Sequence, residues 1–214
     1  MVAGHADEAL EAFEAVLAFP RMSEASAELW AMFWKITVLS SLGREREVPG
    51  LCDKLVASID PTTELSLREA GANALLRKAS ILKNGGDPIG ELATYDMLLS
   101  KFGPDADREF VTLAITSQER RVELLILLDR PVEALLACDD TIARCDGKSG
   151  PPESSEHVAW AFSAKAFVLA REERSEDAAK VYSEIIGRFG PGSPTPLLNF
   201  ASRALVERAA HSFD

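Results

Sequence analysis

The sequence predicts an all-α protein in which antiparallel helical hairpins stack into a solenoid. Three observations predict this fold: a period close to 43 residues, apolar residues at helical spacing within each period, and helix ends marked by proline and glycine. The period is defined by five residues in similar apolar settings, separated by 39, 43, 43 and 44 positions: Phe13, Cys52, Tyr95, Cys138 and Tyr182. One hairpin cannot bury its own apolar faces, so a single domain of about five stacked hairpins is expected over residues 1–214.

One helix of each period is short. These helices are predicted near residues 6–19, 45–59, 88–102, 131–145 and 175–189. The last three align without a gap and start at residues suited to the first turn of a helix: Pro88, Pro131 and Ser175. Gly103 and Gly190, each followed by proline, suit a helix end. In the second short helix, Pro49 and Gly50 interrupt the pattern and predict a kink or distortion.

The other helix of each period is longer. These helices are predicted near residues 24–42, 64–84, 107–128, 156–172 and 195–210. Four of them share a register marked by a basic residue: Lys35, Lys78, Arg121 and Lys165. Such a residue beside a core position covers apolar surface with its stem and keeps its charge in water. A repeated contact to a ligand, or a ladder of charges along one face, stays open as an alternative.

These hairpins resemble the tetratricopeptide repeat family, especially bacterial members whose repeats exceed the usual length of about 34 residues. The segments that carry the resemblance are LGRERE, LDRPVEALLAC and EERSEDAAKVY, at Leu42–Glu47, Leu128–Cys138 and Glu172–Tyr182. The chain departs from the family at the small residue of the short helix, which is alanine in two repeats but Val48 and Glu91 in two others. The resemblance implies a right-handed superhelix whose longer helices line a concave groove that holds a peptide or partner helix.

Carried over by position, the resemblance places twelve residues of the longer helices on that concave face: Trp30, Phe33, Thr37, Asn73, Leu76, Ser80, Thr116, Glu119, Glu123, Trp160, Ser163 and Phe167. Trp30 and Trp160 occupy equivalent positions in their repeats. Aromatic side chains are favoured anchors for a partner, and they are equally suited to packing in a core. The sequence leaves both interpretations open for these two residues.

The expected function is a non-catalytic scaffold that binds another protein or peptide, and the acidic net charge favours a basic partner. The alternative is a sensor, regulatory or oligomerisation module of a larger bacterial signalling or defence protein. Neither end shows a clear polar capping helix, so self-association through uncapped ends is a further expectation. An enzyme would need a polar pocket with perturbed titrating groups, and no such constellation is recognisable in the sequence.

Composition and charge exclude several other classes. The chain has 47% hydrophobic and 27% charged residues, as expected for a folded soluble protein. Its net charge of -11 would repel a phosphate backbone, so nucleic acid is not an expected partner. No apolar run is long enough to span a membrane, and Asp7, Glu8 and Glu11 stand where a signal peptide would be basic or apolar. A cytoplasmic location is therefore predicted.

Neither a metal site nor a cofactor is predicted. Cys52, Cys138 and Cys145 stand where other repeats carry Tyr or Phe, which indicates buried core positions rather than ligands. The three histidines, His5, His157 and His211, are far apart in the sequence. None of them lies in a recognised metal-binding spacing.

Overall fold

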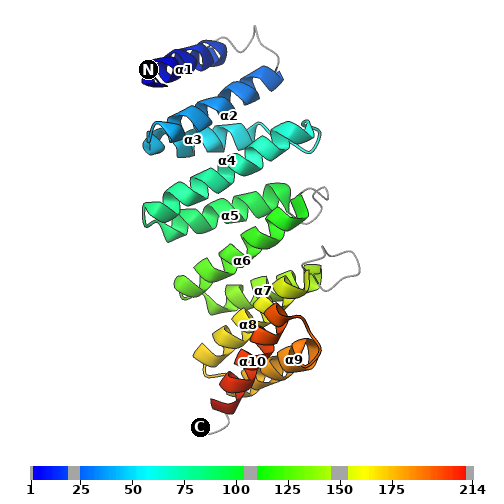
Figure 1. Ribbon diagram of the computed structural model, residues 1–214. Coiled ribbons are helices and arrows are strands. Elements are labelled where there is room, and N and C mark those ends of the chain that lie inside the picture. The colour runs from blue at the N-terminus through cyan, green and yellow to red at the C-terminus, as the bar shows by residue number, and fades with distance from the viewer. Residues whose placement is uncertain (1, 19–24, 104–109, 146–153, 211–214) are drawn as a thin grey trace. The chain divides into compact units, whose positions relative to one another are not determined.

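The computed structural model describes residues 2–18, 25–103, 110–145 and 154–210 (Figure 1). These residues form an all-α structure of ten α-helices that pack mostly against their neighbours in sequence. The α-helices are α1 Val2–Ala18, α2 Ala25–Ser41, α3 Val48–Ala57, α4 Leu65–Asn84, α5 Pro88–Phe102, α6 Val111–Leu127, α7 Pro131–Cys145, α8 Ser154–Arg171, α9 Ser175–Phe189 and α10 Thr195–Ala210. A 3₁₀-helix, η2, spans Glu45–Glu47. The chain divides into two compact units, residues 1–98 and 99–214.

Helix ends follow the proline and glycine pattern closely. α5, α7, α9 and α10 begin and end at the residues predicted from the sequence. The predicted helix 45–59 differs, because the chain forms η2 first and α3 begins only at Val48. Pro49 lies in the first turn of α3, where its missing N–H has no helical partner to lose. The predicted ends at residues 19, 24 and 107–109 lie outside the described residues.

Within each unit, helices pack as stacked hairpins. In the first unit, α2 contacts α1, α3 and α4. In the second, each helix from α6 to α10 packs on the next, and α8 also contacts α6 and α10. The core of the second unit joins side chains from five helices: Ile115, Cys145, Val158, Ala159, Phe162, Ala166, Leu169, Ala178, Val181, Tyr182, Ile185, Phe189, Leu197, Ala201 and Ala204. Burial of these apolar side chains between neighbouring hairpins is what stabilises the stack.

The same turn joins the long and short helices in four successive periods. Its central residue has a positive φ of 71°, 71°, 56° and 58° at Gly43, Gly86, Asp129 and Glu173 respectively. The next residue donates its N–H to a leucine carbonyl five positions earlier; Arg174, for example, donates to Leu169 at 2.9 Å. This is the Schellman helix end. The repeat is therefore a structural unit that recurs every 43 or 44 residues, and more than a pattern of apolar positions.

Glycine at position 173 is expected to stabilise the protein, because a side chain in the left-handed region costs energy that glycine avoids. Glu173→Gly should raise the free energy of unfolding by about 0.5–1 kcal/mol. Thermal and urea unfolding of the purified variant would measure this change. Glu172→Gly is the matched control, since Glu172 has no positive φ. An equal loss of stability in both glycine variants would contradict the energetic cost assigned to the positive φ of Glu173.

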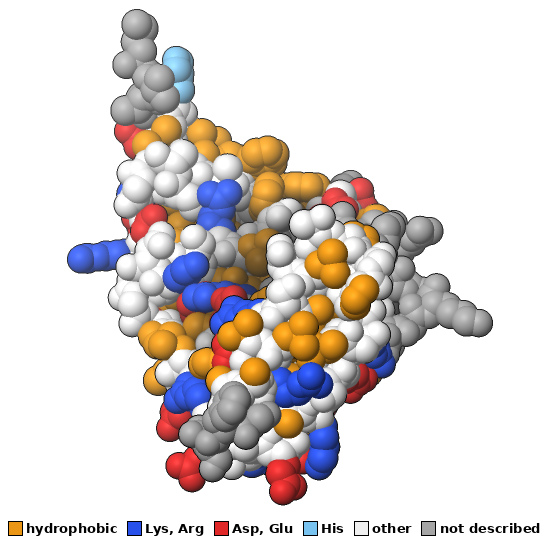
Figure 2. All heavy atoms as spheres, turned by 60° about the horizontal axis from the view of Figure 1, so that its bottom comes forward, with side chains coloured by type: hydrophobic (Ala, Val, Ile, Leu, Met, Phe, Trp, Pro, Cys, Tyr) orange, Lys and Arg blue, Asp and Glu red, His pale blue; other side chains and the backbone are white. Residues whose placement is uncertain are grey.

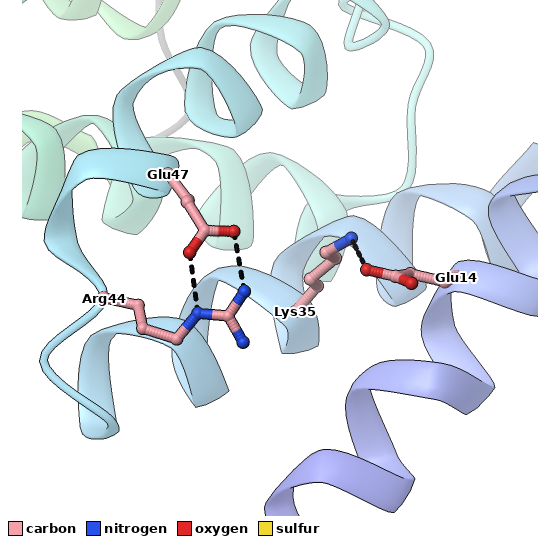
Figure 3. A network of polar contacts seen from close by, with 4 residues as sticks. All are labelled: Glu14, Lys35, Arg44 and Glu47. Carbon is pink, nitrogen blue, oxygen red and sulfur yellow. Dashed lines mark hydrogen bonds and ion pairs between the residues drawn. The ribbon is translucent and has the colours of Figure 1, made fainter.

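Three of the four basic residues that mark the register, Lys35, Lys78 and Lys165, pair with carboxylates of the preceding short helix. Nζ of Lys35 lies 2.7 Å from Oε1 of Glu14, and Figure 3 shows this ion pair beside the bidentate pair of Arg44 and Glu47. Lys78 contacts Asp53 and Lys165 contacts Asp139, each at 2.5 Å. The lysine side chains are 14–26% exposed, so their stems cover apolar surface as predicted. Their ammonium groups are bound by the chain's own carboxylates, which connects successive hairpins.

Candidate binding groove

An open groove with a volume of about 560 Å³ lies in the second unit. Three helices, α8, α9 and α10, form most of its wall, and α6 contributes one residue. The lining residues are Glu123, Trp160, Ser163, Ala164, Phe167, Ala170, Arg171, Tyr182, Ile185, Phe200, Arg203, Ala204 and Glu207. A groove of this size is comparable to known ligand sites and open enough to admit an extended chain or a helix face.

Apolar side chains dominate the groove. Trp160, Ala164 and Phe167 lie at helical spacing on one face of α8, and Phe200 lines the same groove from α10. Trp160 and Phe200 are partly exposed, and Phe167 is 47% exposed. Figure 2, which turns the C-terminal end toward the viewer, shows surface hydrophobic side chains in groups separated by charged ones. Aromatic rings open to solvent within a hollow are suited to binding another apolar group.

Charged groups flank these rings. The carboxylate of Glu123 accepts a hydrogen bond from Arg120 at 2.7 Å. The guanidinium of Arg171 lies 3.2 Å from Asp129 and 6.0 Å from the centre of the Phe167 ring. Burial raises the pKa of the Tyr182 phenol; the nearby charge of Glu207 raises this pKa further and that of Arg203 lowers it. The rim of the groove therefore carries charges of both signs around an apolar floor.

Four of the twelve residues predicted on the concave face come together in this groove: Glu123, Trp160, Ser163 and Phe167. Two further ones on α6 do not line it. Glu119 contacts Nδ1 of His157 at 2.7 Å, and the Thr116 hydroxyl donates to carbonyl oxygens of its own helix. Glu119 is thus bound to a neighbouring helix through His157.

The other six predicted residues belong to the first unit. Trp30, Phe33 and Thr37 lie on α2, and Asn73, Leu76 and Ser80 lie on α4. None of the six is buried. The Phe33 ring makes edge-on contacts with Trp30 and Trp34, with centroids 5.8 and 5.4 Å apart. These aromatic rings form a partly exposed cluster on α2, and Trp30, like Trp160, is only partly buried.

Several groove residues were not predicted from the sequence. Tyr182 and Ile185 come from a short helix, whereas the predicted face used only the longer helices. Arg203 lies on α10, 43 residues after Trp160, so the repeat period itself was a signal that could have found it. Phe200 lies one helical turn before Arg203 on the same helix.

The cysteines occupy core positions, as predicted. Cys52, Cys138 and Cys145 are free thiols, and each is at most 3% exposed. Burial raises the pKa of Cys52 and of Cys138 to about 12.

Among the described residues, no three His, Cys, Asp or Glu side chains gather where they could hold a metal ion. No helix in the described parts of the chain is both long and apolar enough to cross a membrane.

The thiols of Cys52 and Cys138 are expected to resist alkylation in the folded protein. Only the thiolate reacts, and a pKa of about 12 leaves very little of it at pH 8. Iodoacetamide at pH 8 should therefore modify these residues at least about 100-fold more slowly in the native protein than in urea. Peptide mass spectrometry over time would measure both rates. Rapid labelling of either residue without denaturant would contradict the burial described here.

Comparisons of the chain with protein-family models, with curated proteins and with solved structures found no match. Fold alone does not fix function, so the groove and its lining residues are the features that bear on the function of this chain.

Proposed function

We propose that this chain is a non-catalytic protein-interaction module of tetratricopeptide type, a right-handed superhelix that binds a peptide or partner helix in a concave groove. The observation that supports this proposal is the groove of the second unit, lined by Trp160, Phe167 and Phe200 with charged side chains at its rim. An apolar helix face or a strand-like peptide would cover these rings and bring its own polar groups to the rim. Three free, buried thiols fit a protein of the reducing cytoplasm.

The spread of the groove lining over four helices favours a peptide over a small metabolite. Its lining comes from four helices, and its charged side chains are spread over three of them: Glu123 on α6, Arg171 on α8, and Arg203 and Glu207 on α10. A small substrate would need polar groups that converge on one point for orientation and chemistry. A peptide gains binding energy instead from several apolar side chains spread along the groove.

Selection of random peptides displayed on phage, with the full 214-residue chain as bait, would test the proposal. Peptides that bind the parent should bind the Trp160→Ala/Phe167→Ala variant about 30-fold more weakly or worse, because each aromatic anchor is worth at least about 1 kcal/mol. Isothermal titration would measure both dissociation constants.

The matched control is Val132→Ala/Leu136→Ala, which removes two apolar side chains of α7 that are 70% and 64% exposed and do not line the groove. Circular dichroism must show equal helicity and melting for all three proteins. Unchanged peptide affinity in the Trp160→Ala/Phe167→Ala variant would refute the groove as the binding site.

A further inference from the structure

The charges of the groove are not equally available to a partner. Glu123 is bound by Arg120, and Arg171 is held by Asp129 and stacks near the Phe167 ring. Glu207 already interacts with a neighbouring group of the chain. Arg203 differs from these three, because its exposed guanidinium forms no ion pair or hydrogen bond with any residue that the structure describes. The uncommitted charge on the wall of the groove is therefore positive.

We propose that the segment bound in the groove carries an aspartate or glutamate that pairs with Arg203, next to apolar side chains that cover Trp160, Phe167 and Phe200. This inference rests on the proposed function and specifies the chemistry of the partner. A carboxylate is the natural complement of a guanidinium, because both are planar and form paired hydrogen bonds.

The repeat register explains why the charge lies where it does. Arg203 occupies on α10 the position that Trp160 occupies on α8. At this position of the repeat, α8 therefore presents an aromatic anchor to the groove and α10 presents a cation. Phe200, one turn before Arg203, contributes an apolar side chain from the same helix. The partner thus needs one acidic residue at a fixed distance from its apolar anchors.

The net charge of -11 does not argue against an acidic residue at this point. In physiological salt the interaction between exposed charges is screened beyond about 8 Å. The carboxylates on distant helices therefore influence the approach of a partner, whereas the contact itself is decided by the charges within the groove. A partner that is basic elsewhere and carries one acidic side chain opposite Arg203 satisfies both requirements.

Charge exchange between protein and peptide would test the inference. A phage-displayed peptide selected on the parent chain should contain Asp or Glu at one conserved position, and Arg203→Glu should weaken its binding about tenfold. Replacing that acidic residue by lysine should weaken binding to the parent and restore binding to Arg203→Glu. Arg46→Glu is the matched control, since it makes the same change of net charge on an exposed residue of η2, outside the groove.

The outcomes separate this inference from the proposed function. Peptides that lose affinity for Trp160→Ala/Phe167→Ala but bind Arg203→Glu as well as the parent would overturn the acidic-residue inference and leave groove binding intact. Peptides insensitive to both groove variants would overturn the groove itself. Equal weakening by Arg203→Glu and Arg46→Glu would show a general charge effect and would also overturn the inference.

Discussion

Replacing Leu169 by alanine is expected to lower the free energy of unfolding of residues 99–214 by about 3 kcal/mol. Leu169 is 2% exposed and belongs to the core cluster that joins α6, α7, α8, α9 and α10. The substitution removes apolar contacts and leaves a cavity between hairpins, which close packing cannot fill without moving a whole helix. A repeat array gains its stability from such interfaces, so the loss should spread to neighbouring hairpins.

Hydrogen exchange followed by mass spectrometry would locate the effect of Leu169→Ala, and urea unfolding would give its size. Amides of α8 and α9 should lose protection first. The same substitution at Leu136, which is 64% exposed, should change stability by less than about 0.5 kcal/mol. If Leu136→Ala were as destabilising as Leu169→Ala, the assignment of buried and exposed faces in the second unit would be wrong.

The repeat period predicts every long and short helix, because local signals and packing agree there, but α1 begins at Val2 and not at residue 6, and α3 begins at Val48 and not at residue 45. Pro131 starts α7, and Gly190 follows the last residue of α9. The left-handed turns at Asp129 and Glu173 could not be read in the same way, since aspartate is a weaker signal for positive φ than glycine and glutamate rarely adopts it. Gly43 and Gly86 occupy the same repeat position as Asp129 and Glu173, and these glycines indicate that this position adopts a positive φ.

The groove was predicted only in part. The positions of Trp160 and Phe167 follow from helical spacing within one long helix. Tyr182 and Arg203 reach the same groove because α9 and α10 pack beside α8, and that arrangement depends on tertiary contacts. Ion pairs such as that of Lys165 with Asp139 could not be predicted from the sequence for the same reason, since the two partners are 26 residues apart.

Two glycines near the end of α9 are expected to respond in opposite directions to the same substitution. A Cβ atom added at Gly190 would lie 2.5 Å from the carbonyl oxygen of Ile186, far inside van der Waals contact. Because that oxygen belongs to the backbone, the helix end must shift, and Gly190→Ala should lose about 2 kcal/mol of stability. A Cβ atom at Gly187 meets nothing within 4 Å. Gly187→Ala should therefore gain about 0.5–1 kcal/mol through better helix propensity.

The pair tests the ending of α9 more sharply than either variant alone, because both changes add one methyl group within four residues of each other. Thermal unfolding should move the melting temperature down for Gly190→Ala and up for Gly187→Ala. The double variant should show nearly the sum of the two effects, since the steric clash at position 190 does not depend on the propensity at position 187. Two shifts of the same sign would mean that α9 does not end at Phe189. The placement of Tyr182 and Ile185, which α9 contributes to the groove, would then also be wrong.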